Sequence, residues 1–155
     1  MKIKNTITTL FALVSLFAGL AHAGAANVGV DQNDVTLAGY DAVAYFTENK
    51  AVEGSAEYTA TYNNAIYRFS SEDNRNAFNE NPAKYEPQFG GFCAYGAALG
   101  KKFDVNGKAF EIVDGKLYVN KSENVYETWL ENKEENIVNA HTQWETIENV
   151  PAQDL

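Results

Sequence analysis

Cysteine, histidine, methionine and proline are scarce in this chain of 155 residues, which holds one, two, one and three of them. The one cysteine, Cys93, excludes an internal disulfide, so the folded state depends on packing. Structural zinc sites built from four cysteines, or from two cysteines and two histidines, are excluded as well. Basic residues are also few, with 12 Lys and Arg against 21 Asp and Glu and a net charge of −9. We therefore expect no basic, phosphate-neutralising surface and no nucleic-acid partner.

The first 23 residues have the pattern of a secretory signal peptide. Lys2 and Lys4 give a short positive region, residues 10–20 form an apolar run, and Ala21 and Ala23 supply the small residues of a cleavage site. The apolar run is too short to span a bilayer, which disfavours the alternative of an N-terminal membrane anchor. We expect cleavage near Ala23, a periplasmic or secreted location, and no stable membrane anchor in the mature chain.

One domain is expected from about residue 34 to residue 150, after a small and polar lead-in of residues 24–33 that we expect to be flexible. Two β-hairpins are its clearest local elements. Each consists of two strand-like runs around a dipeptide that tolerates the positive φ angles of a two-residue turn. The runs are residues 57–62 and 65–69 around Asn63-Asn64, and residues 109–113 and 116–120 around Asp114-Gly115.

Helices complete the pattern. Ser70 or Ser71 is expected to cap a short helix that ends at Asn81-Pro82. Asn120 with Glu123 resembles a capping box for one or two C-terminal helices. The order of hairpin, short helix, glycine-rich loop and helix, second hairpin and C-terminal helices predicts a small single-domain α+β fold.

The glycine-rich segment of residues 90–100 (GGFCAYGAALG) holds the most informative residue, Cys93. The pattern predicts a loop that opens a short helix ending near Gly100, with Cys93 in its first turn. Backbone N–H groups there lack partners within the helix and stabilise a thiolate, which lowers the pKa of a cysteine below about 8.5. The alternative is that Cys93 is a small buried hydrophobic residue beside Phe92 and Tyr95. An unpaired cysteine in an exported chain is unusual, and this keeps the reactive alternative open.

Six further residues are candidates for a binding pocket. Tyrosine hydroxyls and a neighbouring carboxylate can hold a ligand, although a tyrosine-rich core explains the same residues. Paired glycines let a ligand or an oxidant approach the backbone closely. The candidates are Tyr40, Asp41, Tyr45, Gly90, Gly91 and Tyr95.

Cofactor signals are weak. The sequence has no nucleotide-binding motif. For a soft metal ion, Cys93 and His141 are weak candidate ligands. His141 shares a helical face with Ile137 and Trp144, and a histidine on such a face is more often a packed, hydrogen-bonded residue.

Three segments together resemble the YHS domain family. Residues 37–46 (LAGYDAVAYF) resemble its opening, residues 62–71 (YNNAIYRFSS) its hairpin, and residues 90–95 (GGFCAY) the signature of its exported branch. The resemblance extends over about residues 35–144. It implies that metal-binding members carry cysteine where this chain has Ala44, Ser70 and Asn74, so their metal role does not transfer. It also implies that some exported members carry selenocysteine at the position of Cys93, which favours a functional thiol there.

The leading hypothesis is therefore an exported YHS-domain protein with a thiol-based redox or sensing role through Cys93. With no second cysteine in the chain, turnover would need a partner thiol protein. The alternative hypothesis is a module that binds a soft metal ion or a small ligand without catalysis. Whether the protein is an enzyme is left open, and a third possibility is a structural role with Cys93 in the core.

Overall fold

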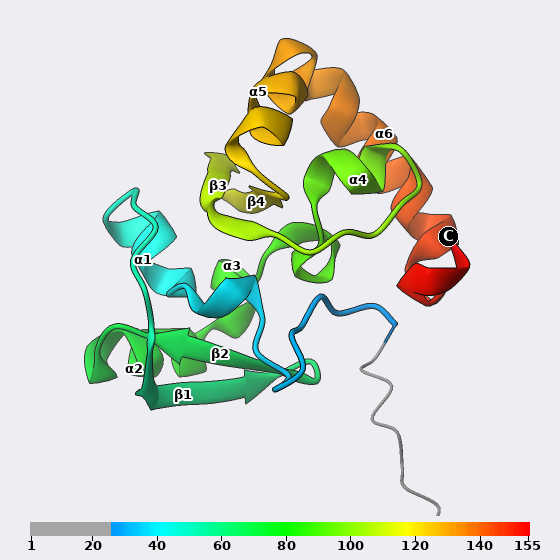
Figure 1. Cartoon of the computed structure of the whole chain (residues 1–155). Helices are drawn as coiled ribbons and strands as arrows, with labels where there is room; N and C mark the ends of the chain where they lie inside the picture. Colours follow the sequence, from blue (N-terminus) through cyan, green and yellow to red (C-terminus); the bar gives the residue numbers. More distant parts are fainter. Residues whose placement is uncertain (1–25) are drawn as a thin grey trace, which may run out of the picture.

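The computed structural model of the protein describes residues 26–155. The expected signal peptide, residues 1–23, lies outside this range. Within residues 26–155, no helix is both long enough and apolar enough to cross a membrane. The chain has the expected α+β fold, with two two-stranded antiparallel sheets and helices around them (Figure 1).

The first half of the fold is built on the first hairpin (Figure 1). Its turn residues Asn63 and Asn64 have φ angles of 47° and 62°, as a two-residue hairpin turn requires. Ser71 caps the following helix by accepting a hydrogen bond from the Asn74 backbone, and Pro82 begins the next short helix. The predicted hairpin and the cap are confirmed. The elements are η1 (Leu37–Gly39), α1 (Ala42–Thr47), β1 (Ser55–Tyr62), β2 (Ala65–Phe69), α2 (Glu72–Glu80) and α3 (Pro82–Tyr85).

The second half is built on the second hairpin, with Asp114 and Gly115 at φ 50° and 72° in its turn. The predicted hairpin is again confirmed, and the C-terminal segment forms two helices, of which α6 packs against α4. The elements are η2 (Gln88–Gly91), α4 (Ala94–Ala98), β3 (Asn106–Val113), β4 (Lys116–Asn120), α5 (Glu123–Glu131), α6 (Lys133–Ile147) and η3 (Ala152–Asp154).

The predicted capping box at Asn120 is wrong. Ser122 is the N-cap of α5, and its hydroxyl accepts a hydrogen bond from the Val125 backbone. Asn120 instead ends β4 and is completely buried. It is not free to cap α5 because its side-chain oxygen accepts from the backbone of Tyr95 in α4.

Strand β4 joins two hydrophobic cores because successive side chains of a strand point to opposite faces. Leu117 and Val119 pack into the core of the first half, with α1, α2 and the first hairpin. Tyr118 packs into the core of the second half, with Trp129 of α5 and Ala140 of α6. Burial on both faces makes β4 the wall that the two halves share.

Residues 26–33, expected to be a flexible lead-in, make specific contacts in the structure. Val28 is buried in the first core, and the Gly29 N–H donates to the carbonyl oxygen of Gly90 at 2.9 Å. The buried ammonium of Lys102 donates to three carbonyl oxygens, those of Ala26, Glu148 and Val150, at 2.6, 2.8 and 2.7 Å. Lys102 thus ties the N-terminal segment to the end of α6.

Candidate functional site

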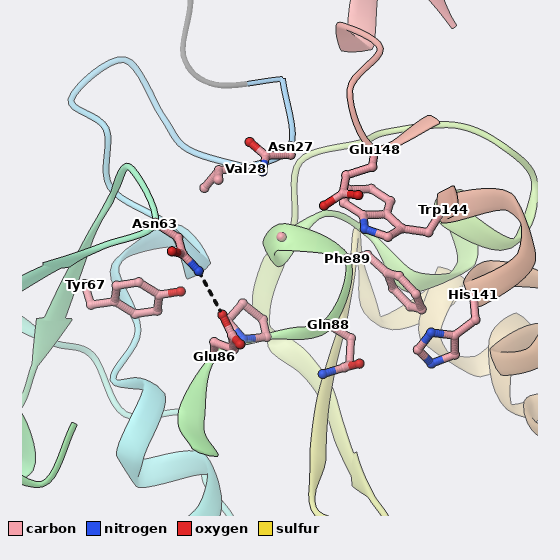
Figure 2. Close-up of a pocket in the computed structure, with 12 residues that line it drawn as sticks. Asn27, Val28, Asn63, Tyr67, Glu86, Gln88, Phe89, His141, Trp144 and Glu148 are labelled. Carbon is pink, nitrogen blue, oxygen red and sulfur yellow. Dashed lines mark hydrogen bonds between the residues drawn. The ribbon is translucent and has the colours of Figure 1, made fainter. Parts of the chain in front are cut away.

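A cleft of about 330 Å³ lies between the first hairpin, the segment from Glu86 to Gly90, and helix α6 (Figure 2). Residues 27 and 28 form a further side of it. Hydrogen-bonding side chains line the cleft together with a smaller number of aromatic ones. Its volume is at the lower end of the range of small-molecule sites. The aromatic residues are Tyr67, Phe89 and Trp144, and the polar ones are Asn27, Asn63, Glu86, Gln88, His141 and Glu148.

The floor of the cleft is a tight turn at Phe89 and Gly90. Pro87 fixes its start by pairing with Leu117 of β4. Phe89 has φ 55° and ψ 38°, a left-handed conformation that is rare for a bulky residue. Its ring is held by packing against His141 and Trp144, with ring centroids 5.0 and 5.8 Å apart. Strained backbone of this kind costs about 1–3 kcal/mol and is concentrated at functional sites.

The hairpin wall of the cleft carries Tyr67 and faces Glu86. The Asn63 side-chain amide donates to the Glu86 carboxylate at 3.3 Å, and Figure 2 shows the Tyr67 hydroxyl pointing toward the same carboxylate. Burial raises the pKa of Glu86, although the hydrogen bond from Asn63 opposes this. Burial, and secondarily the charge of Glu86, also raises the pKa of Tyr67. The Tyr67 hydroxyl is therefore protonated at neutral pH and able to donate.

The opposite wall belongs to α6. His141 Nε2 lies 3.4 Å from the Tyr118 hydroxyl, and burial, with the charge of Lys116, lowers the pKa of His141. The imidazole is therefore neutral at pH 7. The ammonium of Lys102 lies 5.1 Å from the Trp144 ring centroid, which is within cation–π range. Lys102 and Glu148 are close enough that the Glu148 charge raises the pKa of Lys102, against a larger lowering by burial.

Cys93 lies outside this cleft, in the second half of the fold. It is the N-cap of α4 rather than part of its first turn, and its sulfur accepts a hydrogen bond from the Gly96 backbone at 3.4 Å. Only 1% of the residue is exposed. Its thiol donates to Asn120 Oδ1 at 3.6 Å.

The environment of Cys93 raises the pKa of its thiol, contrary to the sequence expectation. Burial is the largest cause, and hydrogen bonds from the backbones of Gly96, Lys121 and Tyr95 only partly oppose it. The helix terminus thus acts in the expected direction, but removal from water outweighs it. In the folded protein Cys93 is a protonated, covered thiol.

The Asn120 side chain accepts the hydrogen bond that the Cys93 thiol donates. Its oxygen accepts from both Cys93 and the Tyr95 backbone, at 3.6 and 3.1 Å. Its amide nitrogen is buried and has no hydrogen-bonding partner among the described residues. The side chain that accepts from the Cys93 thiol thus also carries a buried donor without a partner.

Asp41, a predicted pocket residue, is buried and fully engaged in structural hydrogen bonds. One oxygen accepts from the backbones of Val43 and Ala44, which makes Asp41 the N-cap of α1. The other accepts from the Ser70 backbone and hydroxyl and from the Asn74 amide, at 2.8, 2.7 and 2.7 Å. Residues 44, 70 and 74, where the predicted YHS resemblance places the cysteines of metal-binding members, all donate to this carboxylate. Its five hydrogen bonds hold α1 against α2.

Tyr40 and Tyr45 likewise join elements of the fold. The Tyr45 hydroxyl donates to the Gly107 carbonyl oxygen at 2.7 Å, and burial strongly raises the pKa of that phenol. The Tyr40 ring lies against the same glycine, where an added Cβ would come within 2.2 Å of it. Both tyrosines therefore connect the first half to β3, and neither lines the cleft.

Of the six predicted pocket residues, Gly90 lines the cleft. Gly91 lines a smaller hollow beside residues 29–31, and Tyr95 packs against the second core. The close approach that the paired glycines permit is used by the N-terminal segment, because an added Cβ on Gly90 would lie 1.9 Å from the Asn27 carbonyl oxygen.

The two weak metal candidates lie in different environments. His141 lines the cleft and Cys93 does not. Among residues 26–155, no group of three or more His, Cys, Asp and Glu side chains is arranged to hold a metal ion. The structure therefore provides no support for the metal-binding alternative.

Most cleft residues were not among the sequence candidates. Glu86, Gln88, Tyr67 and Trp144 come from distant parts of the chain and carry no shared spacing. For Asn63 the sequence predicts only a place in the hairpin turn. A signal was present at Phe89-Gly90, where a bulky residue precedes paired glycines.

Comparisons with protein-family models, with curated proteins and with solved structures found no match for this chain. The resemblance to the YHS domain family therefore stays a prediction.

Proposed function

We propose that this protein is an exported module that binds a small organic molecule in the cleft. The observation that carries the proposal is Tyr67. This residue is 4% exposed, and its hydroxyl points into the cleft (Figure 2) without a hydrogen-bonding partner among residues 26–155. The hydroxyl is not among the buried atoms that lack a partner, so it is open to water in the cleft, and a ligand that accepts from it would take the place of that water.

Two other features of the cleft support ligand binding. Phe89 holds a strained backbone conformation at the floor, which a protein retains where the surroundings require it. The side-chain amides of Asn27 and Gln88 also face the cleft. Amides beside aromatic rings are the combination that orients small ligands.

Trp144 provides a direct test because it lies in the cleft, whereas the other tryptophan, Trp129, is fully buried. We expect small aromatic and polar probe molecules to change the fluorescence of Trp144 in a saturable manner. The Trp144→Phe variant should lose this response and keep the constant signal of Trp129. A response that survives in Trp144→Phe would place binding elsewhere.

Tyr67→Phe tests whether the Tyr67 hydroxyl contributes to ligand binding. The variant keeps the ring that packs 4.5 Å from Phe78 and removes only the hydroxyl, so we expect unchanged stability and about tenfold weaker binding. Tyr62→Phe is the matched control, since Tyr62 lies in the same hairpin and does not line the cleft. Equal affinities of Tyr67→Phe and wild type would contradict the proposal.

A thiol-based sensing role of Cys93 is the second candidate function. The observation that favours it is the set of backbone N–H groups that stabilise the thiolate, those of Gly96, Lys121 and Tyr95. The Asn120 side chain, which accepts from the thiol, also has an unpartnered amide nitrogen. When the covering segments open, a peroxide oxygen can bond to the Cys93 thiolate while the peroxide O–O bond breaks, which yields a sulfenate and an alcohol or water. A partner thiol would then restore the reduced state.

Alkylation and peroxide oxidation of the folded chain distinguish this role from simple packing. If Cys93 is a sensor, peroxide should produce a sulfenic acid that a trapping reagent labels without denaturant. Asn120→Ala should shorten the lifetime of the sulfenic acid. A thiol that reacts with neither reagent until denaturant is added would exclude the sensing role.

A further inference from the structure

We propose that the ligand of the cleft is an organic cation, whose ammonium group pairs with Glu86 while its apolar part lies against Phe89 and Trp144. This inference rests on the proposed function and names the chemical class of the ligand. It follows from the charges that line the cleft, from the hydrogen bonds they already make, and from the aromatic side chains beside them.

The formal charges of the cleft lining are all negative. Its ionisable side chains, apart from the Tyr67 phenol, are those of Glu86, Glu148 and His141, and no lysine or arginine lines it. His141 is neutral at pH 7, since burial lowers its pKa. Nothing in the lining would pair with a carboxylate or phosphate ligand, and the net charge of −9 adds long-range repulsion of anions.

The carboxylates of Glu86 and Glu148 differ in whether a positive charge already lies near them. Glu148 lies near the ammonium of Lys102, whose own hydrogen bonds go to three carbonyl oxygens. Glu86 accepts one hydrogen bond, from the Asn63 amide, and makes no ion pair among the described residues. Partial burial without a counter-charge disfavours its ionised form. A cationic ligand at Glu86 supplies the missing counter-charge.

The aromatic side chains suit the rest of such a ligand. Phe89 and Trp144 lie together on the side of the cleft opposite Tyr67 (Figure 2). Ring faces attract cations as well as apolar groups. Trp144 already lies within cation–π range of one ammonium, because Lys102 Nζ is 5.1 Å from its ring centroid. A neutral polyhydroxylated ligand would use the cleft amides but would leave Glu86 without a counter-charge.

The test compares three probes of similar size and different charge: benzylamine, benzyl alcohol and benzoate. Each is titrated into the isotope-labelled chain at neutral pH, and the backbone signals of Phe89 and Gly90 and the Trp144 indole signal are followed. We expect benzylamine to bind at least about tenfold more tightly than benzyl alcohol, and benzoate to bind more weakly than both. Glu86→Gln should reduce the preference for the amine to within about twofold.

Glu80→Gln is the matched control, because Glu80 is exposed at the end of α2 and lies outside the cleft lining. It removes the same charge from the chain and should leave the preference intact. Equal binding of amine and alcohol, or a preference that survives Glu86→Gln, would overturn the inference and leave the proposed function standing. If none of the probes, nor a panel of neutral sugars, shifts the cleft signals, the proposed function fails as well.

Discussion

Asn27 and Gly90 contact each other through their backbones, so closely that a Cβ atom on residue 90 would lie 1.9 Å from the Asn27 carbonyl oxygen. The neighbouring Gly29 N–H donates to the Gly90 carbonyl oxygen at 2.9 Å. Gly90 also has a φ of 60°, which favours glycine. This contact forms one side of the cleft, so the residue at position 90 decides whether the N-terminal segment closes it.

Gly90→Ala should therefore separate the N-terminal segment from the cleft floor. We expect a loss of about 2 kcal/mol of unfolding free energy beyond the cost of the left-handed conformation alone. Gly115→Ala is the control, since Gly115 has φ 72° and nothing lies within 4 Å of an added Cβ. Urea unfolding of both variants measures the difference, and equal losses would show that the contact with Asn27 contributes nothing.

Lys102→Met should loosen both ends of the described chain. Its ammonium is the shared donor to the carbonyl oxygens of Ala26, Glu148 and Val150, and methionine keeps the aliphatic packing without the donors. We expect a loss of about 2 kcal/mol or more and faster amide exchange in the segments around those carbonyls. Lys101→Met, at the exposed neighbouring position, should change stability little. Unchanged exchange in Lys102→Met would contradict this role.

Asp41→Asn, which replaces one carboxylate oxygen by an NH₂ group, should strongly destabilise the first half of the fold. Each carboxylate oxygen accepts from two or more donors, so an amide NH₂ on either side meets a donor where an acceptor is needed. We expect a loss of about 3 kcal/mol, measured by thermal or urea unfolding. Asp73→Asn, at an exposed position in the first turn of α2, serves as the control and should cost far less.

The hairpins and the cap at Ser71 could be predicted because their causes are local. Asn63-Asn64 and Asp114-Gly115 accept the φ angles of the turn whatever surrounds them. The same logic was available at Asp41, an N-cap residue before three helix-compatible residues, yet helix α1 was not predicted from the sequence. The sequence pattern instead indicates a pocket residue at Asp41, because a carboxylate beside tyrosine hydroxyls can hold a ligand.

Asn120 and the cleft could not be predicted because their causes are tertiary. Asn120 has the spacing of a capping residue. Because β4 is buried on both faces, however, its side chain forms hydrogen bonds with Cys93 and Tyr95 instead. The same burial raises the pKa of the Cys93 thiol that local helix geometry alone would lower. The cleft gathers Asn27, Tyr67 and Trp144 from segments with no common sequence pattern.

Glu86→Gln should stabilise the ligand-free protein at neutral pH, because it removes a partly buried negative charge that has no counter-charge. Burial, opposed by the Asn63 hydrogen bond, raises the pKa of Glu86 in the folded state. Below the ordinary carboxyl pKa the group is protonated in both folded and unfolded chains, and its charge costs nothing. Between the ordinary carboxyl pKa and the raised folded pKa the unfolded chain ionises more than the folded one, so stability falls across this interval and the loss is complete above it.

The difference between Glu86→Gln and wild type should therefore be near zero in acid and should grow between the ordinary carboxyl range and neutral pH. We expect less than about 1 kcal/mol at pH 7, because the carboxylate is still partly in contact with water. Glu80→Gln corrects for removing one charge from an acidic chain. Urea unfolding across this pH range measures both variants. If the extra stability of Glu86→Gln does not grow with pH, Glu86 is not an unbalanced charge in the cleft. The same conclusion follows if benzylamine does not stabilise the wild type more than Glu86→Gln.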